Sequence, residues 1–318
     1  MKTAPRILRR AAALLLAAAL LTVTVCCFAE EKGASDMFLD SIPDAYLYNR
    51  MENPGKVIRI TYPTKDYFGD QADIEKNALV YFPPDYSEDV PCDVLFLCHG
   101  VGGTEYEWNF SDMPGTLAGK NVADRAFAKG YVKNLIIVLP NGRSTANCKD
   151  TSWGNMYAFY SFGQELANDL IPYIDEHFNT WSGKLQESDP AAARQHRAMA
   201  GLSMGGMQTI NIGMCECLEL ISAFGAFSAA PTTKTSAEIA AALKAFPEDL
   251  NIRAFYNICG TEDGTAYASA SAAAKTKPDD PRLTEDNWFW QEVKGSHDYS
   301  VWYLGLFNFL KLLGSMQE

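Results

Sequence analysis

A serine between two glycines gives the first indication of chemistry in this sequence. The segment reads Gly201-Leu202-Ser203-Met204-Gly205 and follows the apolar run 196–202. A Gly-x-Ser-x-Gly turn between a strand and a helix strains the backbone and exposes the serine hydroxyl as a nucleophile. A plain turn of small residues would have the same pattern. Ser203 is therefore a candidate nucleophile that must be judged by its partners.

The candidate base for this serine is His297. A serine hydroxyl is a weak nucleophile until a base takes its proton. Where a nucleophile sits in such a turn, the chain order is serine, acid, histidine. The chain has four histidines, and only His297 lies after Ser203. Position therefore favours His297 as the general base.

The acid that would orient this histidine is expected after the strand-like run 253–259. Two carboxylates, Glu262 and Asp263, follow that run directly. A carboxylate here would hold the imidazole in place and stabilise its protonated form. We predict that Asp263 has this role, with Glu262 as the alternative.

A serine that attacks a carbonyl group also needs backbone N–H groups for the oxyanion. The amide of Met204, directly after the serine, is one candidate. The glycine-rich segment 98–108, CHGVGGTEYEW, would supply the second from Val101 or Gly102. This segment lacks the Gly-Lys-Ser/Thr ending of a phosphate-binding loop. We expect His99 to brace the loop rather than act as a base.

The elements that must position these groups alternate along the chain. Helix-like segments separate most of the apolar runs after residue 90, which predicts a mostly parallel sheet covered by helices on both faces. The first two runs are joined by a short turn and should form an antiparallel hairpin at one edge. The eight strand-like runs are 57–62, 77–82, 93–98, 135–140, 196–202, 222–228, 253–259 and 287–293. The fold class is therefore α/β, with an eight-stranded sheet.

Three further segments carry expectations of their own. Residues 141–161 lack periodicity and should form a long loop over the site. Residues 162–178 place apolar side chains four apart, which predicts an amphipathic helix kinked near Pro172. Residues 179–196 are polar and are expected to be a solvated connector.

The N-terminus has the pattern of a secretory signal. Residues 1–29 combine a basic start, an uncharged apolar stretch and a small residue, Ala29, at the expected cleavage point. A retained membrane anchor is the alternative, and no later segment is apolar and long enough to span a membrane. We predict a signal peptide over 1–29 and a single α/β domain over 30–318, which places the mature protein outside the cell.

Charge and cysteine content exclude several classes of partner. Residues 1–29 hold four basic and no acidic residues, so the remaining chain has 23 basic against 39 acidic residues, a net charge of −16. This argues against nucleic acid and anionic lipid as partners.

Six of the eight cysteines lie after residue 29, with no CxxC pair and no zinc-binding pattern. We expect structural thiols, although disulfides are permitted, and we predict no metal and no cofactor.

Five stretches together resemble the feruloyl esterase and acetylxylan esterase group of carbohydrate esterases, the esterase-D-like branch of the α/β-hydrolases. They are LVYFPPDY, VLFLCHGVGGTEYEW, GLSMGG, CGTEDG and GSHDYSVW, and the resemblance covers about residues 40–315. It implies an α/β-hydrolase fold with the nucleophile at Ser203, the acid at Asp263 and the base at His297. It also implies oxyanion donors at Val101 and Met204. Many members of the group carry tryptophan where this chain has Tyr299.

The resemblance further implies hydrolysis of a hydroxycinnamoyl or acetyl ester of plant cell-wall polysaccharide. Aromatic faces suit both a cinnamoyl ring and sugar rings. The predicted substrate-binding residues are Gly102, Trp108, Trp153 and Trp302. We therefore expect an exported feruloyl esterase, acting on polysaccharide or a small ester. An acetylxylan, other short-acyl or thioester esterase is one alternative, and a non-catalytic carbohydrate-binding protein on the same fold is the other.

Overall fold

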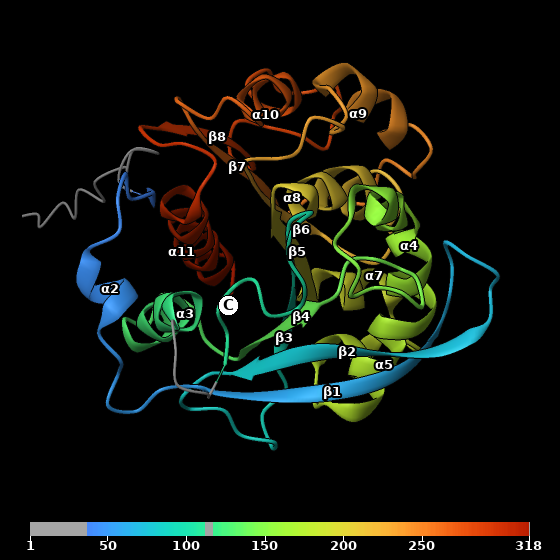
Figure 1. Cartoon of the computed structure of the whole chain (residues 1–318), viewed down its shortest axis with the longest axis vertical. Helices are drawn as coiled ribbons and strands as arrows, with labels where there is room; N and C mark the ends of the chain where they lie inside the picture. The colour runs from blue at the N-terminus through green and yellow to red at the C-terminus, as the bar shows by residue number, and fades with distance from the viewer. Residues whose placement is uncertain (1–36, 112–116, 318) are drawn as a thin grey trace, which may run out of the picture. The chain divides into compact units, whose positions relative to one another are not determined.

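An eight-stranded sheet forms the centre of the computed structural model, which describes residues 37–111 and 117–317 (Figure 1). The spatial order is β1-β2-β4-β3-β5-β6-β7-β8. β2 pairs antiparallel with both β1 and β4, and the other neighbouring strands are parallel. The bounds are β1 Lys56–Lys65, β2 Asp73–Phe82, β3 Asp93–Cys98, β4 Leu135–Pro140, β5 Arg197–Leu202, β6 Ala223–Phe227, β7 Ala254–Gly260 and β8 Trp288–Val293. This confirms the predicted mostly parallel sheet with an antiparallel edge hairpin.

The central strands are apolar throughout because helices cover both of their faces. Every residue of β4, β5, β6 and β7 is buried. Along β3, side chains alternate between two apolar clusters, with Phe96 in one and Leu95 and Leu97 in the other. The sheet is therefore the middle layer of three.

Two helices supply most of the cover on one face, α3 (Ala118–Ala128) and α11 (Tyr299–Ser315). Figure 1 shows them side by side, with the short α2 (Asp44–Tyr48) packed outside them. Tyr46 of α2 contacts the ring of Phe307 on α11, with 5.5 Å between the ring centroids. This face lies away from the segment that runs from residue 141 to 178.

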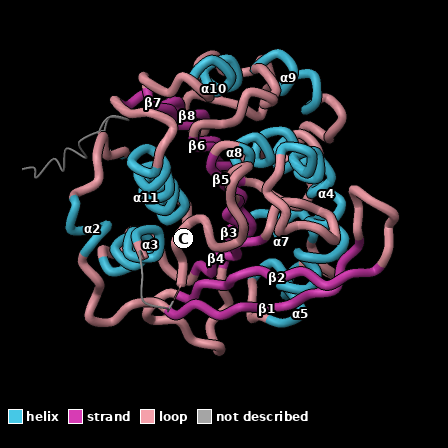
Figure 2. The backbone as a smooth tube through the Cα atoms, in the orientation of Figure 1, coloured by secondary structure: helices cyan, strands magenta, loops and turns pink. Residues whose placement is uncertain are grey.

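The opposite face is covered by many short helical segments, which Figure 2 shows between long loops. They are η1 Trp153–Ser161, α4 Phe162–Glu165, η2 Leu166–Leu170, α5 Ile171–His177, α6 Trp181–Leu185, α7 Pro190–Ala193, η3 Arg194–His196, α8 Met204–Gln208, η4 Thr209–Met214, α9 Ser236–Leu243 and α10 Tyr267–Ala274. The predicted stripe over 162–178 is present, because Phe162, Leu166, Leu170 and Ile174 are all buried. Its helix widens to a π turn, η2, directly before the segment that contains Pro172.

The expectation of a solvated connector over 179–196 holds only in part, since most of its residues are exposed or half-buried but it is not an irregular connector. The segment folds into α6, α7 and η3, and its side chains Ser182 and Arg194 are buried. Arg194 donates hydrogen bonds to the carbonyls of Leu218 and Ile221. A buried arginine that pairs with backbone carbonyls leaves no mark in local polarity, which explains the error.

The helices of the described residues contain no segment that is both long and apolar enough to cross a membrane. The predicted signal peptide, residues 1–29, lies outside the described residues. Residues from Met37 onward cluster as one compact unit.

Candidate active site

Ser203 lies in a sharp turn at the carboxyl end of β5, directly before α8. Its backbone has φ 51° and ψ −113°, a conformation that residues other than glycine seldom adopt. The Ser203 amide donates to the carbonyl of Phe227 on the neighbouring strand, at 2.9 Å. A Cβ atom on Gly201 or Gly205 would lie 2.5 Å from backbone atoms of the turn or of Cys98. Both glycines are therefore required by close backbone approach.

His297 and Asp263 lie beside this serine and bond to each other. The Nε2 atom of His297 is 3.1 Å from the Ser203 hydroxyl oxygen, and its Nδ1 atom is 2.8 Å from Asp263 Oδ2. His297 follows β8 and Asp263 follows β7, so three carboxyl-terminal strand ends meet here. Glu262 is exposed and Asp263 is buried. The structure thus brings the predicted nucleophile, base and acid together, with Asp263 rather than Glu262 in contact with the histidine.

Asp263 is held as a carboxylate. Burial alone would raise its pKa, but hydrogen bonds from His297 and from the Ala266 amide outweigh burial and lower the pKa to about 2. Its other oxygen accepts the amides of Thr265 and Ala266, at 3.0 and 2.8 Å. Because the carboxylate can only accept, Nδ1 of His297 carries the proton and Nε2 is free to accept one from Ser203.

The loop after β3 lies against the serine. The Gly100 carbonyl accepts from His99 Nδ1 at 2.7 Å and from the Gly103 amide at 3.2 Å. In a trans peptide the N–H points opposite to the carbonyl, so the Val101 amide is directed away from these partners. The structure places Gly100 against the serine, since a Cβ on Gly100 would lie 3.3 Å from the Ser203 Cβ. Met204 begins α8, where the first amides have no acceptor within the helix.

Comparison with known proteins agrees with this geometry. The family model Esterase, described as "Putative esterase", matches residues 71–229, half of the chain. The chain belongs to the Esterase family. The matched segment contains Ser203 but ends before Asp263 and His297. These two residues are linked to it by the hydrogen bonds of His297 with Ser203 and with Asp263.

Two curated relatives of this Esterase family member are larger enzymes. The chain is 28% identical over 182 residues to endo-1,4-beta-xylanase Y of Acetivibrio thermocellus. It is 31% identical over 173 residues to an endo-1,4-beta-xylanase/feruloyl esterase of Xylanibacter ruminicola. The matches cover 57% and 52% of this chain but only 15% and 20% of those proteins.

Solved structures show that the fold is that of α/β-hydrolase-type esterases. A mutant of the feruloyl esterase module from Clostridium thermocellum, complexed with sinapinate, matches with a TM-score of 0.69 and 24% identity, over 86% of this chain and 93% of that one. A CE1 ferulic acid esterase from Anaeromyces mucronatus, in complex with ferulic acid, matches with a TM-score of 0.66 and 21% identity, over 88% and 99%. The predicted fold class and the resemblance to the feruloyl esterase group are both confirmed.

A second layer of polar residues, which the sequence did not reveal, holds the loop after β3. The buried guanidinium of Arg143 donates to the carbonyls of Val101 and Gly103 and lies over the Phe159 ring, 4.7 Å from its centroid. Glu107 accepts the Gly100 amide at 2.6 Å, and burial raises the pKa of this carboxyl. Both contacts fix backbone beside the proposed oxyanion donors.

His99 has the bracing position expected of it, between two loops. It is fully buried, donates from Nδ1 to the Gly100 carbonyl and accepts the Gly142 amide at Nε2, 3.0 Å away. Burial lowers its pKa to about 3, so the ring is neutral. With both nitrogens engaged, it links the loop after β3 to the loop after β4.

The predicted substrate-binding residues separate into different roles. Trp108 is wrongly placed in that group, because its ring is 1% exposed and its Nε1 donates to the Cys98 carbonyl. Trp302 is largely buried and packs perpendicular to His297, with ring centroids 5.1 Å apart. Gly102 is exposed in the loop after β3, and Trp153 is 74% exposed at the start of η1. Only the last two therefore present free surface.

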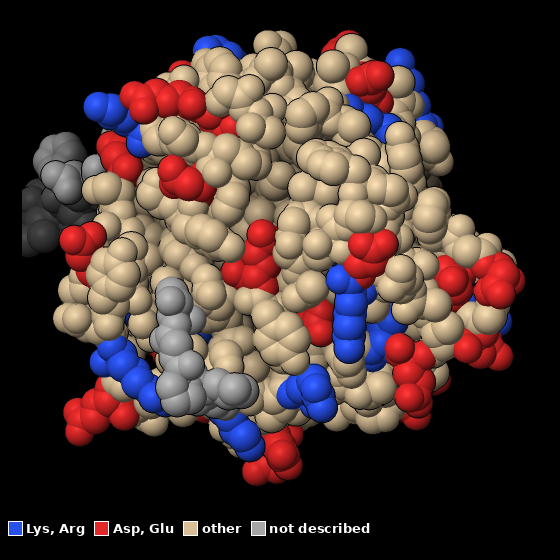
Figure 3. All heavy atoms as spheres, in the orientation of Figure 1, with Lys and Arg blue, Asp and Glu red and all other residues tan. Residues whose placement is uncertain are grey.

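The thiol of Cys259 contacts the site, since its Sγ lies 3.6 Å from Asp263 Oδ2. The six cysteines within the described ranges are free thiols. Residues 37–111 and 117–317 contain no cluster of histidine, cysteine and acidic side chains that could hold a metal ion. On the face drawn in Figure 3, many charged side chains lie around the rim, and a group of acidic atoms stands near the middle among uncharged ones.

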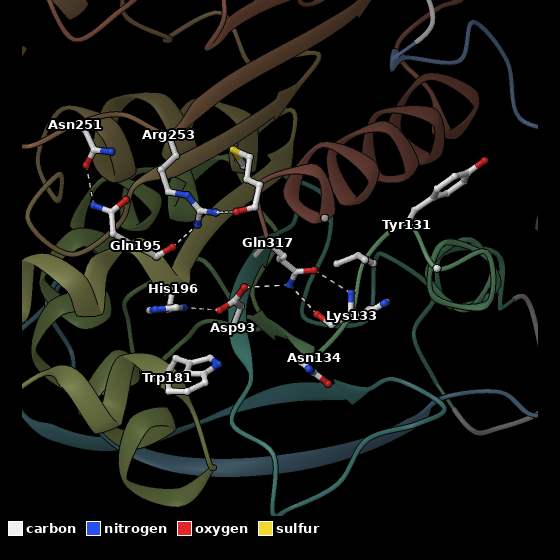
Figure 4. Close-up of a pocket in the computed structure, with 14 residues that line it drawn as sticks. Asp93, Tyr131, Lys133, Asn134, Trp181, Gln195, His196, Asn251, Arg253 and Gln317 are labelled. Atoms are coloured by element: carbon white, nitrogen blue, oxygen red, sulfur yellow. Dashed lines mark hydrogen bonds and ion pairs between the residues drawn. The ribbon is translucent and has the colours of Figure 1, made fainter. Parts of the chain in front are cut away.

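A cavity of about 770 Å³ lies at the amino-terminal ends of the parallel strands (Figure 4). Its polar side chains already bond to one another. Asp93, at the start of β3, accepts from His196 at 2.7 Å and from Gln317 at 3.0 Å. Trp181 stacks on His196, with 5.7 Å between ring centroids. Because Ser203 lies at the opposite strand ends, this cavity takes no part in the site.

Proposed function

We propose that this protein is an exported serine esterase that hydrolyses hydroxycinnamoyl esters carried by plant cell-wall polysaccharide. The observation that carries the proposal is the hydrogen-bonded series from Asp263 through His297 to Ser203 in a strained turn. Membership of the Esterase family supports ester hydrolysis. The names of the matched proteins, xylanase/feruloyl esterase and ferulic acid esterase, support the acyl group and the polymer.

In the proposed first half-reaction, His297 Nε2 takes the hydroxyl proton as Ser203 Oγ attacks the ester carbonyl. The carbonyl oxygen gains the negative charge, and the Val101 and Met204 amides stabilise it. Collapse of this intermediate breaks the bond to the alcohol oxygen, which leaves with the proton from His297. The acyl group is now an ester of Ser203.

In the second half-reaction a water molecule replaces the alcohol. His297 takes a proton from the water while the water oxygen attacks the acyl carbonyl. The bond to Ser203 Oγ then breaks, and His297 returns the proton to this oxygen. Asp263 stabilises the imidazolium in both steps without taking the proton itself. The products are the free alcohol and a carboxylic acid, which ionises at neutral pH.

The test is hydrolysis of methyl ferulate and of p-nitrophenyl acetate by the protein lacking residues 1–29, with Ser203→Ala as the control. We expect a clear preference for methyl ferulate and a loss of turnover of about 10⁴-fold or more in Ser203→Ala. Activity on the acetate alone would assign the chain to short-acyl esterases such as acetylxylan esterases. Retention of most activity in Ser203→Ala would refute the proposed nucleophile, and activity on neither ester would favour a carbohydrate-binding protein.

Export is part of the proposal and is supported by the signal-like residues 1–29. N-terminal sequencing of protein collected from the medium of a producing culture should begin at Glu30. Protein that stays with the membrane and begins at Met1 would show a retained anchor instead.

A further inference from the structure

Three aromatic rings on one helix stand out from the surface beside the candidate active site. Trp153 is 74% exposed, Tyr157 59% and Tyr160 37%, all on η1. Rings of this size normally bury most of their area, and their exposure as a group marks a binding surface. We call these three residues the η1 aromatic face.

Two of the three rings lie in a row. A 3₁₀ helix has three residues per turn, so Tyr157 and Tyr160 lie one above the other, with ring centroids 6.3 Å apart. Trp153 lies four residues before Tyr157, about one and one-third turns, so its ring stands on an adjoining side of η1. The three rings are therefore exposed on two adjoining sides of the same short helix.

The other side of η1 is fixed to the active-site elements. Phe159, between the two tyrosines, is buried with Met204 and Met207 of α8, and Val101 packs against the same cluster. Gln208 of α8 donates to the Phe159 carbonyl at 2.9 Å. The helix that carries the η1 aromatic face is thus packed, through Phe159, on the elements that carry Ser203 and the proposed oxyanion donors.

The start of η1 is also ordered by polar contacts. Asn155 is buried and donates to the carbonyls of Asn147 and Asp150, at 2.9 and 2.8 Å. Asp150 in turn accepts the amide and hydroxyl of Ser152, at 2.9 and 3.0 Å. These bonds order the backbone turn from which the exposed Trp153 ring projects.

The chemistry of this surface selects a neutral polymer. Aromatic faces stack on the C–H faces of sugar rings, and the chain carries a net charge of −12. That charge disfavours an anionic ligand and a second copy of the same acidic chain, but it does not repel an uncharged polysaccharide.

We propose that the η1 aromatic face binds the backbone of a neutral plant polysaccharide and so delivers a chain-borne ester to Ser203. This inference rests on the proposed function for its substrate, but it makes a separate statement about the polymer. The rings would lower the KM for polymeric substrate and leave the chemical step to Ser203, His297 and Asp263.

The kinetic test compares feruloylated arabinoxylan with methyl ferulate for the double variant Trp153→Ala/Tyr157→Ala. We expect kcat/KM on the polymer to fall about tenfold relative to kcat/KM on methyl ferulate, mainly through KM. Trp181→Ala is the matched control, because this tryptophan is 42% exposed near the amino-terminal ends of the strands, away from Ser203 (Figure 4). It should leave the ratio unchanged. A parallel fall on both substrates, or an unchanged ratio, would overturn the proposal.

A binding test separates this proposal from the esterase assignment. Soluble arabinoxylan stripped of its esters should retard the full chain carrying Ser203→Ala in a native gel, and adding Trp153→Ala/Tyr157→Ala should abolish the retardation. This outcome supports the η1 aromatic face even if the protein hydrolyses no ferulate ester. Equal retardation with and without the two rings would sink it. So would a change from dimer to monomer in the double variant without an effect on retardation, because the rings would then contact a second copy.

Discussion

At the scale of single residues, His99 joins two loops through hydrogen bonds that depend on the protonation state of its ring. Its Nδ1 donates to the Gly100 carbonyl and its Nε2 accepts the Gly142 amide. A second proton on Nε2 would face the Gly142 N–H donor and break that bond. The neutral ring is therefore required by the contacts as well as by burial.

This arrangement predicts a pH dependence of stability. Burial lowers the pKa of His99 from 6.5 to about 3 in the folded chain. Between these values the unfolded chain binds the proton and the folded chain does not, so stability is lost as pH falls from about 6.5 towards 3. Each pH unit in this window should cost about 1.4 kcal/mol of unfolding free energy from this residue.

Urea unfolding of the protein and of His99→Gln, at several pH values within the window, measures this slope. The difference in unfolding free energy between the two proteins should shrink as the pH is lowered. His177→Gln provides the control, because His177 is exposed on α5. A constant difference across the window would show that His99 accepts a proton in the folded state.

The same scale shows what the sequence could and could not predict. Ser203, Asp263 and His297 were predictable as a group because a strained turn and a fixed chain order restrict the choice. Arg143 and Glu107 were not. Each acts on backbone through contacts that depend on how two loops meet, and neither lies in a recognisable motif. Trp108 was misjudged for the same reason, since its sequence position does not show that the ring turns into the core.

At the scale of elements, a buried ion pair helps to connect β2 to the loop after β4. Lys76 of β2 bonds to both oxygens of Glu165 on α4, at 2.7 Å, and both side chains are almost completely buried. Lys76 also donates to the carbonyls of Asn141 and Arg143, and Ser144 donates to Glu165. The pair thereby holds the loop that carries Arg143.

Breaking this pair should destabilise the protein and weaken catalysis together. Glu165→Gln leaves the Lys76 charge buried without its carboxylate, which costs about 3–5 kcal/mol. Loosening of the loop should also lower kcat on small esters. Replacing both residues, as Lys76→Met/Glu165→Leu, removes the buried charge and should recover much of the stability.

Chemical denaturation of Lys76→Met, Glu165→Leu and the double variant gives the coupling energy between the two residues. Asp73→Asn is the control, since the Lys65–Asp73 pair is exposed and should contribute little. Additive losses in the double variant would mean that Lys76 and Glu165 act independently of each other.

The elements themselves were largely predictable where burial was uniform. The parallel strands are continuous apolar runs because both faces are covered, and their positions agree with the structure. Prediction missed the helices within 179–196, because α6, α7 and η3 are shorter than the window over which a periodic pattern can be detected. In 141–161, the expected loop ends in η1, where Tyr157 and Tyr160 are exposed and Phe159 between them is buried.

At the scale of the whole molecule, the negative charge affects the proposed product more than the proposed substrate. The chain carries a net charge of −12, and Glu107 places a carboxyl beside the loop after β3. A feruloyl ester is neutral, whereas ferulate released at neutral pH is an anion. The field of the protein should therefore disfavour rebinding of the product without opposing the substrate.

This asymmetry predicts how salt changes inhibition by ferulate. Raising the ionic strength from about 10 mM to about 1 M shortens the screening length from about 30 Å to about 3 Å. Repulsion is then screened, so the inhibition constant of ferulate should fall by about twofold to threefold. The KM for methyl ferulate, an uncharged molecule of similar shape, should change much less. Glu107→Gln should lower the inhibition constant already at low salt and reduce its dependence on salt. An inhibition constant that rises with salt would instead reveal a cationic group that attracts the carboxylate, and would contradict repulsion of the product by the net charge.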